Sequence, residues 1–220
     1  MGPIQVRAPH AASRQGRLRI GIDFDNTIIS YDEVFRQMAK DRGLIGPDFT
    51  GHKQALRDTI RLLPDGEIAW QCLQGQVYGK GIASARIITG FESFLRRSRR
   101  EGCSVSVVSH KTVYGHYDPD RVNLRTAALD WMVAEGLTSG EHAIALSDIY
   151  FESTRAEKLS RIAKLSLTHF IDDLEEVLSD PDFPPGVTPV LFAADGTSSG
   201  VSYLVCTSWK QIEEQIFGRA

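Results

Sequence analysis

Residues 18–27 read LRIGIDFDNT, and this stretch decides the fold and holds the first candidate site residues. Apolar and small residues give way abruptly to polar ones after Ile22, which predicts a buried strand that ends at a polar edge. Side chains alternate along a strand, so Asp23 and Asp25 are expected to point the same way. Two carboxylates this close raise each other's pKa unless a cation neutralises them or one keeps its proton. A strand end followed by an Asx turn would explain the pair without any chemistry.

Residues 30–88 have the pattern of a small helical insertion between this strand and the rest of the chain. Ser30 followed by Glu33 forms a capping box, in which a serine at the helix start is followed three residues later by glutamate. The expected helices of the insertion cover about residues 31–42, 52–63 and 66–78.

From residue 89 onward, expected strands and helices alternate. Helix starts are predicted at three capping motifs, Thr89…Glu92, Thr154…Glu157 and Ser208…Gln211. Strands are expected at residues 103–109, 143–147, 168–172, 188–193 and 201–205, with helices over about 89–102, 121–135, 154–165 and after 208. This alternation predicts an α/β fold whose mainly parallel sheet is covered on both faces. In such sheets ligands collect at the C-terminal ends of the strands.

Acids and a hydroxyl stand just past three of the expected strand ends. These residues are Asp23 and Asp25, Ser109, and Asp172 and Asp173. Mg²⁺ prefers a few carboxylates together with retained waters. We therefore expect Asp23, the backbone carbonyl of Asp25, and Asp172 to hold Mg²⁺, and Asp173 to orient a metal-bound water.

This set of residues predicts phosphoryl transfer. Asp23 would attack phosphorus and form an aspartyl-phosphate, while Asp25 would act as general acid and then as general base. The hydroxyls of Thr27 and Ser109 would bind the phosphoryl oxygens. Ser109 has an alternative interpretation as a turn hydroxyl or a helix cap.

A lysine is expected to neutralise the remaining phosphate charge and to keep the nucleophile ionised. Lys158 is the first candidate, because it lies in the first turn of the helix that Thr154 begins. Lys164 is the alternative, although near the helix C-terminus it would point away from the strand ends. Lys158 could also be an ordinary solvated helix lysine.

Basic residues at two further places are candidates for substrate contact. His110 and Lys111 follow Ser109 directly, on a loop at the active edge of the expected sheet. Within the insertion, Lys53, Arg57 and Arg61 recur at helical spacing and form either a basic stripe toward the site or a solvated face, of which the solvated face is favoured.

These residues resemble the motifs of the haloacid dehalogenase (HAD)-like hydrolases. Residues 23–27, DFDNT, resemble the first motif, Val107-Val108-Ser109 the second, Lys158 the third and Ile171-Asp172-Asp173 the acidic fourth. The resemblance implies a Rossmann-like three-layer sandwich, with a core of residues 18–29 and 89–220 and a cap of residues 30–88. It also implies aspartyl-phosphate chemistry with Mg²⁺ as cofactor, because the second aspartate marks the phosphatase and phosphotransferase branches.

The overall composition is that of a globular protein of one large domain, or of a core with a small accessory piece. The chain has 220 residues, of which 42% are hydrophobic, and its formal net charge of −3 does not suggest a nucleic-acid partner. Its three cysteines, Cys72, Cys103 and Cys206, are expected to be free thiols in a reducing compartment. We expect no membrane span, a cytoplasmic location, and a disordered leader over residues 1–17.

Three functions remain compatible with these observations. The first is a Mg²⁺-dependent phosphatase acting on a small phosphorylated metabolite, such as a sugar phosphate or a nucleotide. The second passes the phosphoryl group to another hydroxyl, as a phosphotransferase or mutase does. The third is a non-catalytic binding or regulatory protein on the same fold. The sequence indicates neither the substrate nor the oligomeric state.

Overall fold

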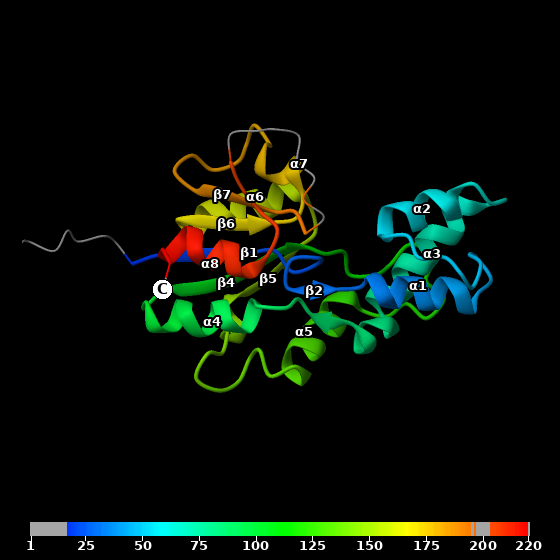
Figure 1. The fold of residues 1–220 in the computed structure, drawn as a ribbon, viewed down its shortest axis with the longest axis horizontal. Helices are drawn as coiled ribbons and strands as arrows, with labels where there is room; N and C mark the ends of the chain where they lie inside the picture. Colours follow the sequence, from blue (N-terminus) through cyan, green and yellow to red (C-terminus); the bar gives the residue numbers. More distant parts are fainter. Residues whose placement is uncertain (1–16, 195, 197–202, 220) are drawn as a thin grey trace, which may run out of the picture.

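The computed structural model describes residues 17–194, 196 and 203–219. A six-stranded sheet forms its centre, in the order β5-β4-β1-β6-β7-β8, and all five strand pairings are parallel (Figure 1). The strands are β1 (Arg19–Ile22), β4 (Ser104–His110), β5 (Ile149–Glu152), β6 (His169–Asp172), β7 (Thr188–Phe192) and β8 (Leu204–Cys206). The α/β fold with a parallel sheet is therefore confirmed.

Strand β1 lies at the point where the strand order reverses. From β1 the chain adds β4 and β5 on one side, and then returns to add β6, β7 and β8 on the other side. Ile22 pairs with Val107 of β4 and with Ile171 of β6. Open parallel sheets bind ligands outside the strand ends at such a reversal.

Two separate hydrophobic clusters cover the two faces of the sheet. Residues alternate between them along each strand: Ile171 belongs to one cluster and Phe170 to the other. Gly21 of β1 lies against the second cluster, where an added Cβ would stand 2.3 Å from the Leu167 side chain. The first cluster includes side chains of α4 (Phe91–Arg100), α5 (Leu124–Ala134) and α8 (Trp209–Phe217), and the second those of α6 (Arg155–Lys164) and α7 (Glu175–Leu178). The result is a three-layer sandwich.

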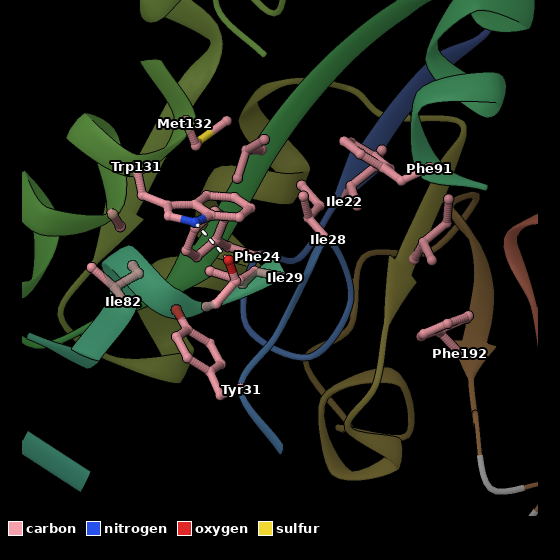
Figure 2. Close-up of a cluster of buried hydrophobic side chains, with 14 of the residues drawn as sticks. Ile22, Phe24, Ile28, Ile29, Tyr31, Ile82, Phe91, Trp131, Met132 and Phe192 are labelled. Carbon is pink, nitrogen blue, oxygen red and sulfur yellow. Dashed lines mark hydrogen bonds between the residues drawn. The ribbon is translucent and has the colours of Figure 1, made fainter. Parts of the chain in front are cut away.

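The helical insertion follows the first strand, as expected. It contains α1 (Asp32–Asp41), α2 (Lys53–Arg61), α3 (Gly66–Tyr78) and a 3-10 turn (Lys80–Ser84), and an antiparallel pair of β2 (Ile29–Ser30) and β3 (Arg86–Ile87) stands at its base. Figure 1 shows α1, α2 and α3 grouped together at one end of the molecule. Tyr31 and Ile82 of the insertion belong to the same cluster as Phe24 and Trp131 of the sheet region (Figure 2). One hydrophobic core therefore continues from the sheet into the insertion.

The expected strand over residues 143–147 is wrong. The fifth strand begins later, at Ile149, after a 3-10 turn over Leu146–Asp148. Ile144 is the one buried apolar residue of the expected segment, and Leu146 is 59% exposed. The sheet selects residues 149–152, IYFE, because β-branched and aromatic side chains pack well on a pleated surface. The expected strand over 201–205 lies partly outside the described residues, and β8 covers Leu204–Cys206.

Two of the four predicted helix caps are confirmed. The hydroxyls of Thr154 and Ser208 accept the backbone N–H groups of Glu157 and Gln211. The caps at Ser30 and Thr89 are wrong, because α1 begins after Tyr31 and α4 after Gly90, and neither has a side-chain cap. Ser30 pairs with Arg86 in the small antiparallel sheet and is therefore not free to begin a helix.

The remaining structural expectations concern cysteines, membranes and the N-terminus. The three cysteines are free, and Cys103 and Cys206 are buried. None of the helices in the described part of the chain combines the length and apolar character that a membrane crossing needs. The expected leader over residues 1–17 lies outside the described residues, except for Arg17.

Candidate active site

Three carboxylates meet where β1 and β6 end side by side. The backbone N–H of Asp23 donates to Ile171 O at 2.8 Å, which continues the pairing of the two strands by one residue. Carboxylate oxygens of Asp23, Asp172 and Asp173 all lie within 4.8 Å of one another. The structure therefore brings together residues that are about 150 positions apart in the chain.

A tight turn after β1 holds the second aspartate. Ile28 N–H donates to Phe24 O at 3.0 Å, and Asn26 adopts the left-handed conformation with φ of 57°. Asparagine tolerates this conformation better than most residues. The Asn26 side-chain amide donates to Asp173 at 3.2 Å, so the turn also contacts the carboxylate group.

Lys158 lies between two of the three carboxylates. Its Nζ donates to Asp23 Oδ1 and to Asp172 Oδ2, both at 2.6 Å, and the residue is only 1% exposed. Thr154 begins α6 one turn earlier and so directs this lysine inward. Lys164, at the other end of the same helix, is exposed. Of the two candidate lysines, the structure brings Lys158 to the site.

One lysine does not balance the charge of these carboxylates. Burial raises the pKa of Asp23 to about 7; the Lys158 ammonium opposes this shift and the Asp172 carboxylate adds to it. Burial, and then the charges of Asp23 and Asp172, raise the pKa of Asp173 well above its ordinary value. Burial alone would lower the pKa of Lys158, but its two carboxylate partners outweigh burial and raise it.

A hard divalent cation fits this excess of negative charge. Three carboxylates with oxygen atoms this close offer ligands of the kind Mg²⁺ prefers, and the cation would offset the like-charge repulsion. The backbone carbonyl of Asp25 stays a predicted ligand, and the Asp25 side chain lies outside the three-carboxylate group.

The side chain of Asp25 has two donors of its own. Tyr31 Oη donates to Oδ1 at 2.7 Å, and Lys111 Nζ donates to Oδ2 at 2.8 Å and to Oδ1 at 3.0 Å. Lys111 is 3% exposed, so its ion pair with Asp25 is largely shielded from water. The expected substrate-contact residue Lys111 is thus held against the second aspartate.

A cleft of about 380 Å³ opens over these residues. Asp23, Asp25 and Asp173 line it, together with Ser109, His110 and Lys111 from the end of β4 and with Lys158. His110 Nε2 lies 3.0 Å from Ser153 O. Thr27 does not line the cleft: it is fully buried, and its hydroxyl has no hydrogen-bond partner among the described residues. Of the two hydroxyls predicted to bind phosphate, the structure therefore brings Ser109, but not Thr27, to the cleft.

Several residues of the cleft are not among those that the sequence favours for the site. The insertion contributes Lys53, Gln74 and Tyr78, and α6 contributes Arg155 at its first position. The basic repeat in α2 was one available signal, although its solvated interpretation was favoured. Only Lys53 of that repeat reaches the cleft, since Arg57 pairs with Asp58 and Arg61 pairs with Glu67.

Comparison with solved structures shows which proteins share this fold. A haloacid dehalogenase-like family hydrolase from Streptococcus pneumoniae matches with a TM-score of 0.59 and 14% identity, over 91% of this chain and 98% of that chain. The chain has the haloacid dehalogenase fold. A HAD family hydrolase from Deinococcus radiodurans, solved with bound phosphate and sodium, matches with a TM-score of 0.54 and 14% identity, over 91% and 95% of the two chains.

The haloacid dehalogenase fold is also that of a protein with a different named activity. Protein tyrosine kinase A of Mycobacterium tuberculosis matches with a TM-score of 0.62 and 16% identity, over 92% of this chain and 99% of that chain. No protein-family model and no curated protein matches the sequence. At these identities the comparisons establish the fold, while the activity has to be argued from the site.

Proposed function

We propose that the chain is a Mg²⁺-dependent phosphatase that hydrolyses a small phosphorylated metabolite through an aspartyl-phosphate on Asp23. The observation that supports this most is the position of Asp23 at the end of β1, held by Lys158 and adjacent to Asp172 and Asp173. A nucleophilic carboxylate, a cationic partner and a cation site beside it are the parts that phosphoryl transfer needs.

In the first half of the reaction, Asp23 attacks phosphorus and the bond to the leaving oxygen breaks. Lys158 contacts Oδ1 of Asp23, so we assign the attack to Oδ2. The leaving oxygen takes its proton from Asp25, which must carry that proton when the cycle begins and regains it from water in the second half; Tyr31 and Lys111 hold its carboxyl group in place. Mg²⁺, when bound by Asp23, Asp172 and Asp173, would reduce the repulsion between a carboxylate and a phosphate dianion.

In the second half, water hydrolyses the aspartyl-phosphate. Asp25 takes a proton from the attacking water, inorganic phosphate leaves, and Asp23 returns as a free carboxylate. The Ser109 hydroxyl and the Lys158 ammonium are the donors for the phosphoryl oxygens, since both line the cleft beside Asp23.

Replacement of the nucleophile tests this proposal. Asp23→Asn keeps the shape of the side chain but removes the attacking carboxylate, so we expect phosphate release to fall by at least about 1000-fold. The measurement is phosphate release from a panel of phosphorylated metabolites with Mg²⁺, with the thermal unfolding of both proteins as a control for folding. A folded variant that keeps wild-type turnover would exclude Asp23 as the nucleophile.

Phosphoryl transfer to a second hydroxyl is the alternative that shares this intermediate. The site supports it because an aspartyl-phosphate on Asp23 can pass its phosphoryl group to an alcohol oxygen as well as to water. Product analysis separates the two functions. With an alcohol acceptor added, a phosphatase still releases inorganic phosphate, whereas a phosphotransferase yields the phosphorylated acceptor. A non-catalytic protein would release no phosphate from any substrate.

A further inference from the structure

Within the described part of the chain, four cationic side chains line the cleft, and three of them have carboxylate partners. Lys158 pairs with Asp23 and Asp172, Lys111 pairs with Asp25, and Arg155 pairs with Glu176. The fourth is Lys53, and no described carboxylate lies within ion-pair distance of its Nζ. Lys53 is therefore the exception in a cleft where other cations are neutralised.

The contacts of Lys53 leave part of its bonding capacity unused. Its Nζ donates to Tyr78 Oη at 2.8 Å and lies 5.1 Å from the centre of the Phe35 ring and 5.4 Å from that of Tyr78. An ammonium group has three N–H donors, and the tyrosine hydroxyl takes one of them. Ring faces attract the charge but do not neutralise it.

Lys53 keeps its charge in this position. Burial alone would lower its pKa, but the Tyr78 hydroxyl and the more distant carboxylates of Asp25 and Asp173 outweigh burial and leave the pKa above its ordinary value. The raised pKa means that the fold favours the ammonium form of Lys53, which is the form that attracts an anion. A negatively charged ligand would supply the direct ion-pair partner that Lys53 lacks among the described residues.

The position of Lys53 indicates which part of a substrate it faces. It is the first residue of α2 in the insertion, whereas Asp23, Ser109 and Lys158, the residues assigned to contact the phosphoryl group, come from the sheet region. In an in-line displacement the leaving group points away from the nucleophile. Next to the cleft lies a second cavity of about 160 Å³, between α3 of the insertion and the segment after β4, and it shares Gln74, Tyr78, Thr112 and Leu124 with the cleft. The insertion side of the cleft therefore has room for the leaving group.

We propose that Lys53 binds a negatively charged group on the leaving-group part of the substrate, either a carboxylate or a second phosphate. The preferred substrates are then acidic phosphomonoesters, and this inference rests on the proposed phosphatase function. A purely structural role for Lys53, in which it only packs on Phe35 and Tyr78, predicts no preference of this kind.

A matched pair of substrates tests the proposal. 3-Phosphoglycerate and glycerol 3-phosphate differ by a carboxylate in place of a hydroxymethyl group, and the measurement is the ratio of their kcat/KM values. We expect wild type to prefer 3-phosphoglycerate, and Lys53→Met to lower this ratio by about 10- to 100-fold, the effect of one charge-assisted hydrogen bond. Lys53→Gln keeps a hydrogen-bond donor for Tyr78 and should lower the ratio by the same factor. It serves as the test variant if Lys53→Met fails to fold. The ratio of kcat/KM for fructose 1,6-bisphosphate to that for fructose 6-phosphate repeats the comparison, with a second phosphate in place of the carboxylate.

Arg61→Met is the matched control, because it removes one positive charge from the same helix at a residue that does not line the cleft. It should leave the ratio at the wild-type value. An unchanged ratio in both Lys53 variants, or a wild type that treats acidic and neutral esters alike in both comparisons, overturns the proposal while the phosphatase function stands. If wild type releases phosphate from no ester at all, the proposed function itself fails.

Discussion

The two aspartates that follow the first strand have different lysine partners. Asp23 has Lys158 as its partner and lies in the three-carboxylate group, whereas Asp25 has Lys111 and Tyr31 and lies outside that group. Two carboxylates of one motif therefore have different surroundings. Different surroundings allow one carboxylate to act as the nucleophile and the other as the acid–base residue.

Removal of Lys111 should affect the acid–base step. In Lys111→Met the Asp25 carboxylate loses two of its three hydrogen bonds, and an acid–base residue is worth about 100- to 10,000-fold only when it is well placed. We expect kcat to fall by about 10- to 100-fold. Steady-state kinetics on the best substrate measures this, with Lys164→Met as the control, because Lys164 is an exposed lysine outside the cleft. A Lys111→Met enzyme within twofold of wild-type kcat would contradict the orienting role of Lys111.

At the scale of elements, helix α3 meets the loop after β4 in unusually close packing. A Cβ added to Gly115 would lie 2.4 Å from Gly75 Cα, and one added to Gly75 would lie 2.9 Å from Asp118 Cβ. Two glycines thus allow the insertion and the sheet region to touch through their backbones. The same loop begins with Lys111, so this contact also helps to hold Lys111 beside Asp25.

A methyl group at this contact should destabilise the protein. We expect Gly115→Ala to lower the free energy of unfolding by about 1–3 kcal/mol, because the clash is with backbone rather than with a flexible side chain. Urea unfolding measures the change. Gly46→Ala is the control, since an added Cβ there meets no atom within 4 Å and should change stability little. Equal stability of Gly115→Ala and wild type would show that the contact relaxes without cost.

At the scale of the whole molecule, folding brings Asp23, Asp172 and Asp173 together against one lysine. The pKa of Asp23 rises from 3.8 to about 7 on folding, because burial and Asp172 outweigh the attraction of Lys158. Below about pH 4 both the folded and unfolded forms carry this proton. Between about pH 4 and 7 the unfolded chain loses it first, so this group lowers the free energy of unfolding as pH rises.

Mg²⁺ should therefore stabilise the protein more at high pH than at low pH. The cation needs ionised ligands, and protons compete with it for Asp23 below about pH 7. At a concentration 100-fold above its dissociation constant, Mg²⁺ should add about 2.7 kcal/mol at about pH 8, and clearly less at about pH 5. Urea unfolding with Mg²⁺ and with a chelator measures this increase in the free energy of unfolding at each pH. Asp172→Asn should make the increase smaller. Equal stabilisation at both pH values would exclude Asp23 as a metal ligand.

The sequence by itself determined the features that depend on near neighbours in the chain. The strand that ends just before Asp23 and the helix caps at Thr154 and Ser208 follow from patterns of a few residues, and the structure has them where they are expected. The meeting of Asp23 with Asp172 was also predictable, because parallel strands share one edge for their C-terminal ends.

Only the tertiary structure decided which side chains pair across the cleft. The donors to Asp25, the inward position of Lys53 rather than Arg57, and the start of β5 at Ile149 all depend on contacts between distant segments. In each case several nearby residues had the right chemical type. The choice among them was made by packing against other elements, which local patterns do not encode.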